Sequence, residues 1–272
     1  MSASALVLTY NEEKNIERCL KSLQWCDEVV VLDSYSTDRT IEIAKKLGAV
    51  VVMKEFEDYA SQRNYGLNSI DYKNEWVLMV DADEIVPPEL AQEIRERIVQ
   101  APSQVTMFRI ARIEHFLDGT LDHCMGNIWY GRLVRRGKVW VARKINEEYH
   151  TDGEILCLKN KLLHYPFCKG LTHWFDKHNK YSTLEAQEKL NNALTRSRMK
   201  DLLSRDPVRR RAALKRLGFR LRFRPLLSFV YMYLIKRGFL DGKAGFRYCL
   251  LRSIYEYMID LKVIEKKISS IG

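Results

Sequence analysis

The chain has 272 residues, of which 46% are apolar and 29% charged, and its formal net charge at pH 7 is +10. This apolar content supports a packed core, in one large domain or in one domain with an appendage, and it excludes an intrinsically disordered chain. The six cysteines form no Cys-x-x-Cys pair, so we expect reduced thiols in a cytoplasmic protein rather than a disulfide framework or a zinc site.

The first 85 residues alternate between apolar strands and amphipathic helices. We predict strands at residues 5–10, 28–33, 49–53 and 75–81, separated by helices at 15–23, 37–48 and 59–70. Continuous apolar strands between helices are typical of a mostly parallel sheet with helices on both faces, so we predict a Rossmann-like α/β fold. No basic region precedes the first apolar run, and no run reaches the roughly 18 apolar residues of a spanning helix, so we expect neither a signal peptide nor a transmembrane segment.

The rest of the chain is expected to extend this sheet and then to become helical. A helix that begins with prolines is predicted at 87–100, and strand-like stretches fill residues 105–165. Further helices are predicted at 170–195, 207–222 and 243–268. We divide the chain into a catalytic domain at 1–195, with halves at 1–100 and 101–195, and a C-terminal region at 196–272.

Polar segments follow three of the four predicted strands. They are TYNEE after the first strand, DSYSTD after the second and DADE after the fourth. The carboxyl ends of parallel strands lie at one edge of a sheet, and such sheets bind their ligands at that edge. We therefore expect the functional site there.

The segment DADE, residues 81–84, ends an apolar strand with three carboxylates. Asp81 and Asp83 would point to the same side of a strand, because side chains alternate between its two faces. Neighbouring carboxylates repel each other, and Mg²⁺ or Mn²⁺ is typically held by one or two carboxylates together with substrate phosphates. The pattern indicates a divalent metal site; a solvated loop is the alternative.

Four segments, in this order and spacing, resemble family 2 glycosyltransferases, which have the GT-A fold. They are LTYNEEKNIERCLKSL, VVLDSYSTDRTIEIA, ASQRNYG and VLMVDADE, all within the first 84 residues. Two later stretches, at 145–186 and FLDGKAGFRY at 239–248, resemble the bacterial enzymes that build lipopolysaccharide core and exopolysaccharide. The resemblance implies a nucleotide-sugar donor and a bound Mg²⁺ or Mn²⁺.

The resemblance places Thr9, Asn11 and Glu12 at the nucleotide end of the donor, and it places Asp33 against the base, usually uracil. Short polar side chains at strand ends can hydrogen-bond a base edge and a ribose. Asn11 could also cap the helix that follows it, and Asp38 could be only a cap in the segment STDRT.

The diphosphate and the metal are implied to contact later residues. Arg63 is a candidate phosphate ligand, because a guanidinium can bind phosphate through two N–H groups; a surface arginine is the alternative. In the motif Asp81-Ala82-Asp83, Asp81 would orient toward the ribose and the metal, and Asp83 would ligate the metal. His164 matches a late histidine that many GT-A enzymes place near this metal; a buried packing histidine is the alternative.

Inverting transfer by a single displacement needs a base that takes the proton of the acceptor hydroxyl. The family uses an acidic residue in a downstream Glu-Asp-like motif, and the nearest match here is the segment NEE, with Glu147 first and Glu148 second. The match departs from a plain Glu-Asp pair. His150 is a weaker alternative base, and an exposed loop glutamate is the non-catalytic alternative.

The positive charge is concentrated near the C-terminus. Residues 196–237 hold 14 of the 45 Lys and Arg residues but only 2 of the 35 Asp and Glu residues. Arginines alternate with Leu, Phe and Tyr over 209–240, which is typical of a helix lying on an anionic membrane. A helical cap with a solvated basic face is the alternative; no nucleic-acid-binding motif accompanies the charge, so we expect no nucleic-acid partner.

Together these features predict a metal-dependent hexosyltransferase that moves a sugar from a nucleotide-sugar, a UDP-sugar, to a core oligosaccharide or another lipid-linked glycan. We expect it to work in lipopolysaccharide or exopolysaccharide synthesis, attached peripherally to the cytoplasmic face of a bacterial inner membrane. Two alternatives are a sugar-phosphate nucleotidyltransferase and a non-catalytic membrane-binding protein with this fold. The nucleotidyltransferase would need a glycine-rich basic loop after the first strand, where TYNEEKN has no glycine.

Overall fold

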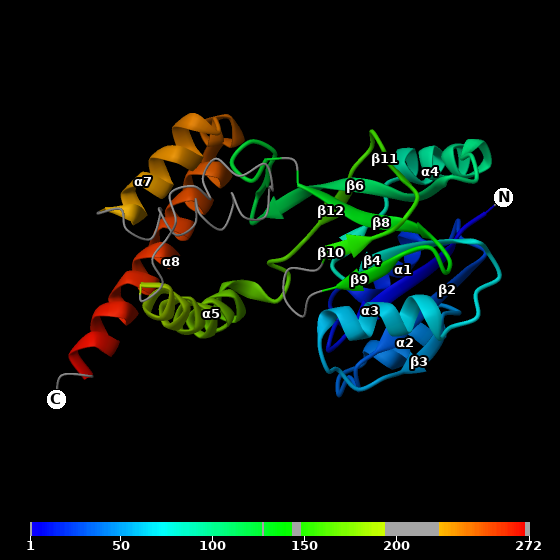
Figure 1. Ribbon diagram of the computed structural model, residues 1–272, viewed down its shortest axis with the longest axis horizontal. Coiled ribbons are helices and arrows are strands. Elements are labelled where there is room, and N and C mark those ends of the chain that lie inside the picture. Colours follow the sequence, from blue (N-terminus) through cyan, green and yellow to red (C-terminus); the bar gives the residue numbers. More distant parts are fainter. Residues whose placement is uncertain (1, 127, 143–147, 194–222, 270–272) are drawn as a thin grey trace. The chain divides into compact units, whose positions relative to one another are not determined.

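A computed structural model describes residues 2–126, 128–142, 148–193 and 223–269 (Figure 1). The chain forms two compact units. The first comprises Met1–His115 and Asn127–Cys168, and the second comprises Phe116–Gly126 and Lys169–Gly272.

The first unit is built on one large mixed sheet. Its strands are β1 (Ser4–Thr9), β2 (Glu28–Asp33), β3 (Val50–Met53), β4 (Trp76–Asp81), β5 (Glu84–Ile85), β6 (Val105–Phe116), β8 (Trp129–Arg135), β11 (Glu154–Cys157) and β12 (Leu162–His164). The order across the sheet is β3-β2-β1-β4-β8-β6-β12-β5, and β11 pairs with β6. The first four strands are parallel, as predicted, and β8 runs antiparallel to both β4 and β6.

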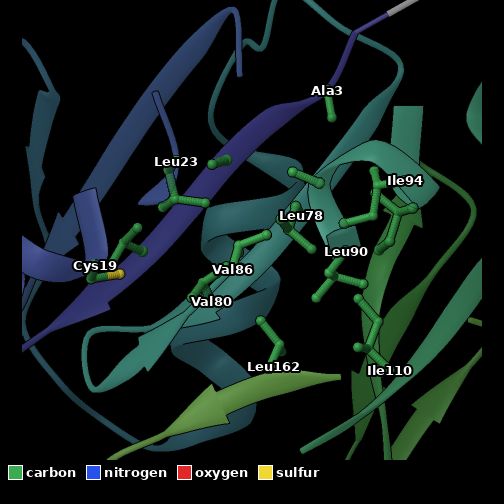
Figure 2. Close-up of a cluster of buried hydrophobic side chains, with 14 of the residues drawn as sticks. Ala3, Cys19, Leu23, Leu78, Val80, Val86, Leu90, Ile94, Ile110 and Leu162 are labelled. Carbon is green, nitrogen blue, oxygen red and sulfur yellow. The ribbon is translucent and has the colours of Figure 1, made fainter. Parts of the chain in front are cut away.

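Helices cover both faces of this sheet. They are α1 (Ile16–Ser22), α2 (Thr40–Lys46), α3 (Tyr59–Asn68) and α4 (Pro88–Gln100). Alternate residues of β1 enter different cores: Val7 packs with α1, α2 and α4, while Leu6 packs with α3. Figure 2 shows the first of these cores, where Leu90 and Ile94 of α4 meet Leu78 and Val80 of β4. The predicted α/β fold, with a mostly parallel sheet between two helical layers, is confirmed.

The sequence located most elements of this unit to within a few residues. The helix predicted at 37–48 is shorter than expected, since α2 begins only at Thr40. It stops where Gly48 adopts a φ of 80°, a left-handed conformation that favours glycine. Asn11 does not cap α1, because the residue at the cap position is Asn15. The residue at the cap position of α2 is Arg39, and Asp38, one residue earlier, accepts the Thr40 N–H at 3.0 Å through its Oδ1.

A small two-stranded sheet completes the first unit. It pairs β9 (Trp140–Ala142) with β10 (Glu148–His150) in antiparallel register. Asn64 of α3 fixes β9 through two hydrogen bonds to the Val141 backbone, at 2.7 and 2.8 Å.

The second unit is mainly helical. Its elements are β7 (Gly119–Leu121), α5 (Gly170–Ala193), α7 (Arg224–Val230), the π-helix η2 (Tyr231–Ile235), the 3-10 helix η3 (Gly238–Asp241) and α8 (Gly242–Ser269). We predicted that α5 belongs to the catalytic domain at 1–195, but α5 packs against α8, where Lys189 bonds Asp260 at 2.6 Å. The helix predicted at 207–222 lies outside the described residues, and so do residues 209–222 of the basic segment at 209–240. Among the helices that the structure describes, none has the length and apolar character needed to cross a bilayer.

The segment FLDGKAGFRY joins η3 to α8 through a close approach of backbones. A Cβ atom on Gly245 would lie 2.1 Å from the carbonyl oxygen of Gly238, so only glycine fits there. The Asp241 carboxylate accepts the N–H groups of His123 and Cys124 at 3.0 and 2.9 Å. These contacts give the segment a structural role within the second unit.

Candidate active site

The DADE segment forms a tight turn between β4 and β5. Asp81 ends β4, Glu84 begins β5, and the fully buried Glu84 carboxylate accepts the Asp81 N–H at 2.9 Å. The Asp83 carbonyl accepts the Tyr165 N–H at 2.9 Å. The Glu84 carboxylate therefore closes the turn that carries Asp81 and Asp83.

Strand register brings a histidine beside this turn. β12 lies between β6 and β5, and His164 is aligned with Glu114 on one side and with Glu84 on the other. His164 Nε2 lies 3.3 Å from Asp83 Oδ2, and His164 Nδ1 is hydrogen-bonded to Glu114. The structure thus joins Asp83 and His164, two residues that are far apart in the sequence and that the resemblance implied as metal ligands.

Asp81 is held by two arginines. Arg63 Nη2 lies 3.0 Å from Oδ1, and Arg132 Nη2 lies 2.6 Å from Oδ2. Burial raises the pKa of Asp81, but the guanidinium groups of Arg132 and Arg63 outweigh it and hold that pKa well below its usual range. Asp81 is therefore ionised and fixed, and its expected contact with the metal stays a prediction because both of its oxygens are bonded to arginine here.

Asp83 and His164 form a charged pair. Burial raises the pKa of Asp83, but its contact with His164 lowers that pKa below the usual range. Burial lowers the pKa of His164, but the carboxylates of Asp83 and Glu114 outweigh it and raise that pKa to about 10.

The donor set at this pair fits a divalent cation. Asp83 supplies a hard oxygen, and Glu114 fixes the orientation of the His164 ring as carboxylates commonly do for metal-binding histidines. Within the described ranges, no three His, Cys, Asp or Glu residues form a ready ligand group. Two protein ligands fit Mg²⁺ or Mn²⁺, which usually keeps several waters and binds substrate phosphates.

The nucleotide-end residues form one hydrogen-bonded cluster at the ends of β1 and β2. The Asp33 carboxylate is fully buried and accepts bonds from Thr9 Oγ1 at 2.7 Å and from the Ser36 N–H at 2.6 Å. Asn11 donates its N–H to Ser36 Oγ at 2.8 Å, and the Glu12 N–H donates to Thr40 Oγ1 at 2.7 Å. The cluster ties the two loops together, and a contact between Asp33 and a base stays a prediction.

Ala82 and the candidate bases Glu147, Glu148 and His150 are the remaining predicted site residues. The Ala82 side chain is buried in the core, so only its backbone could face a ligand. Glu147 lies outside the described residues. Glu148 is on β10, where its carboxylate lies 3.8 Å from His150 Nε2. A catalytic role for any of these three polar residues stays a prediction.

Three further residues complete this network and were not predicted from the sequence: Arg112, Glu114 and Arg132. Arg132 of β8 bonds Glu84 at 2.6 Å as well as Asp81, and it is 2% exposed. Arg112 of β6 lies 3.2 Å from Glu84 and 3.1 Å from Glu114. A signal was present, since charged residues at alternate positions of an apolar strand, as in ARIEHF, need buried partners of opposite charge.

Comparison with known proteins gives consistent matches. The family model described as Glycosyl transferase family 2 matches residues 4–168. An uncharacterized glycosyltransferase of Rickettsia bellii is 45% identical over 92 residues, which cover 34% of this chain and 31% of that protein. The chain thus matches about a third of the length of the Rickettsia relatives. The lipopolysaccharide core biosynthesis glycosyltransferase LpsC of Rhizobium meliloti is 25% identical over 97% of this chain and 92% of that protein.

Two solved structures are also similar. The match to TarS of S. aureus has a TM-score of 0.43 at 17% identity, and it covers 92% of this chain and 90% of the TarS chain. Glucosyl-3-phosphoglycerate synthase from Mycobacterium tuberculosis, crystallised with Mn²⁺, UDP and glucosyl-3-phosphoglycerate, has a TM-score of 0.35 at 23% identity and covers 42% of this chain and 44% of its own.

Proposed function

Because the chain belongs to glycosyl transferase family 2, we propose that it transfers a hexose from a UDP-sugar to a glycan acceptor with inversion, in one displacement that depends on a divalent metal. The observation that carries this proposal is the Asp83–His164 pair, 3.3 Å apart, beside an Asp81 that two arginines hold ionised. Family membership favours sugar transfer over the nucleotidyltransferase alternative.

Asp83 and His164 would hold Mg²⁺ or Mn²⁺. When bound, the ion neutralises charge that develops on the leaving diphosphate. Arg63, which is buried beside Asp81, would add a guanidinium on the diphosphate side. Since His164 has a pKa of about 10, metal binding at Nε2 must displace a proton, so metal affinity should increase with pH.

The acceptor hydroxyl attacks the anomeric carbon, and its oxygen forms the new glycosidic bond while the bond to UDP breaks. A carboxylate must take the hydroxyl proton. We assign this step to the segment that contains Glu147 and Glu148, with Glu147 as the first candidate. UDP leaves with the electron pair of the broken bond.

The acceptor is proposed to be a lipopolysaccharide core oligosaccharide or a related lipid-linked glycan. The resemblance of residues 145–186 and 239–248 to enzymes of this kind agrees with the match to LpsC over nearly the whole chain. A lipid-linked acceptor would lie at the cytoplasmic leaflet of the inner membrane, where nucleotide-sugars are available.

Transfer itself tests this function. UDP release should be measured from a panel of UDP-sugars, with Mn²⁺ and a delipidated lipopolysaccharide core oligosaccharide as acceptor. We expect one UDP-sugar to give acceptor-stimulated release that chelation by EDTA abolishes. Stimulated release that survives EDTA would contradict the metal requirement, and release from a GDP-sugar instead would contradict the choice of donor.

An anionic membrane surface is the proposed second partner. The described part of the basic segment exposes a run of apolar side chains that begins one residue before α7 and continues to the end of η2: Phe223, Leu226, Leu227, Val230, Tyr231, Leu234 and Ile235. The α8 helix exposes a second run at three- and four-residue spacing: Phe246, Leu250, Ile254, Tyr257, Leu261, Ile264 and Ile268. Lys236, Arg237 and Lys243 lie among these residues, which favours a bilayer with acidic headgroups.

The double variant Leu234→Glu/Ile235→Glu should weaken membrane binding. Each aliphatic side chain contributes about 1.5–3 kcal/mol when fully buried in an apolar phase, so we expect the partition coefficient to fall at least about tenfold. Flotation with vesicles of phosphatidylglycerol and phosphatidylcholine measures it. The control is Val99→Glu, an exposed apolar residue of α4 in the first unit. Equal flotation of the double variant and the control would contradict attachment through this surface.

A further inference from the structure

An exposed tryptophan of the first unit is stacked on a histidine. Trp140, on β9, is 46% exposed, although large aromatic side chains are usually covered. Its ring lies 5.8 Å from the ring of His150, on β10, with an angle of 17° between their planes. His150 stacks on one side of the Trp140 ring, and nothing in the proposed mechanism uses the exposed part of that ring.

The register of β9 and β10 puts a carboxylate on the same face. Trp140 is opposite His150, and Ala142 is opposite Glu148. Side chains two apart on a strand share a face, so Glu148 and His150 lie on the side of Trp140. Glu148 is 3.8 Å from His150 Nε2.

The residues that alternate with these, Val141 and Tyr149, point toward the large sheet and hold the two strands in place. Val141 is buried in the core that α3 covers. The Tyr149 ring packs so closely over Gly131 of β8 that a Cβ atom there would lie 3.0 Å from Tyr149 Cγ. The aromatic face is therefore fixed on a packed scaffold, as a binding surface needs.

The same strand is tied to the helix that carries Arg63. Asn64 of α3 receives the Val141 N–H at 2.8 Å and donates to the Val141 carbonyl at 2.7 Å. Its neighbour Arg63 bonds Asp81 at 3.0 Å. The aromatic face and the donor end of the site thus share one rigid support, α3, within one unit (Figure 1).

From this geometry we infer that Trp140 and His150 bind a sugar ring of the acceptor glycan, with Glu148 accepting hydrogen bonds from its hydroxyl groups. A pyranose has an apolar face of C–H groups that packs on an aromatic plane and a rim of hydroxyls that suits a carboxylate. Two rings and one carboxylate match one sugar rather than a protein partner, which needs about 800 Å² on each side. The inference rests on the proposed glycosyl transfer and names the site of its acceptor.

Trp140→Ala tests this site. The probe is a delipidated lipopolysaccharide core oligosaccharide, and its binding is followed by quenching of tryptophan fluorescence and by the KM for acceptor. We expect Trp140→Ala to remove the quenching and to raise the acceptor KM at least about tenfold, with kcat and the Kd for UDP unchanged. Trp140→Phe, which keeps an aromatic ring, should restore the KM to within about threefold of wild type.

Trp129→Ala is the matched control, since Trp129 is also exposed, at 41%, on β8 of the same unit. It should keep the wild-type KM and quenching. An unchanged acceptor KM in Trp140→Ala would overturn the inference, and so would a wild-type protein whose fluorescence the oligosaccharide does not change. If the wild type bound no UDP, the proposed function itself would be wrong. UDP binding therefore distinguishes failure of the proposed function from failure of the proposed acceptor site.

Discussion

Replacing Arg132 with methionine is expected to lower the free energy of unfolding by about 3–5 kcal/mol. The fully buried Glu84 and the partly buried Asp81 would each lose one of the two arginines that pair with them, so that only Arg112 and Arg63 remain. Arg132 Nη2 lies 2.6 Å from both Asp81 and Glu84, and the Glu84 carboxylate is fully buried. Transfer activity should fall with it, since Asp81 loses one of the two groups that orient it. Urea denaturation followed by circular dichroism measures the stability.

The control for Arg132 is Arg39→Met. Arg39 also pairs with a carboxylate, that of Glu42 at 3.2 Å, but both side chains are exposed. Solvent-exposed ion pairs contribute little to stability, so this variant should stay close to wild type. If Arg132→Met lost no more stability than Arg39→Met, the buried network would not hold the DADE turn as we describe.

The second large effect is expected for Asp83→Asn, which should reduce transfer at limiting Mn²⁺ by at least about 100-fold, more than the 10–100-fold typical of outer-shell changes. The amide is a poorer ligand than the carboxylate, so part of the rate should return at high Mn²⁺.

Glu114→Gln, which changes only the group behind His164, should weaken metal affinity by about 10–100-fold. UDP release titrated with Mn²⁺ measures both variants.

Asp71→Asn is the control for these variants, because the Asp71 side chain is 97% exposed and lies outside the site. It should show the wild-type dependence on Mn²⁺. A fully active Asp83→Asn at low Mn²⁺ would exclude Asp83 as a metal ligand.

The sequence was informative where local pattern decides the structure. The strands up to Asp81 are continuous apolar runs with polar ends. Their parallel direction could therefore be predicted, and so could the position of Asp33 and Asp81 at the same edge of the sheet. His164 came from the resemblance alone, and its place beside Asp83 depends on the pairing of β12 with β5 and β6.

The arginines could not be placed in the same way. Arg132 reaches Asp81 only because β8 inserts antiparallel between β4 and β6. The register between strands that are distant in the sequence cannot be predicted from any one short segment. The boundary of the second unit shows the same limit. The bond between Lys189 of α5 and Asp260 of α8 joins residues that are 71 positions apart in the sequence, so periodicity alone could not predict that the two helices pack together.

A calorimetric titration of UDP with and without Mn²⁺, on the wild type and on Asp83→Asn, tests the metal-dependent donor site most directly; GDP and ADP are the controls. We expect UDP to bind the wild type in a Mn²⁺-dependent manner, more tightly than GDP or ADP, and we expect Asp83→Asn to lose this dependence. Absence of nucleotide binding to the wild type under either condition would contradict a metal-dependent nucleotide-sugar site at the end of β4.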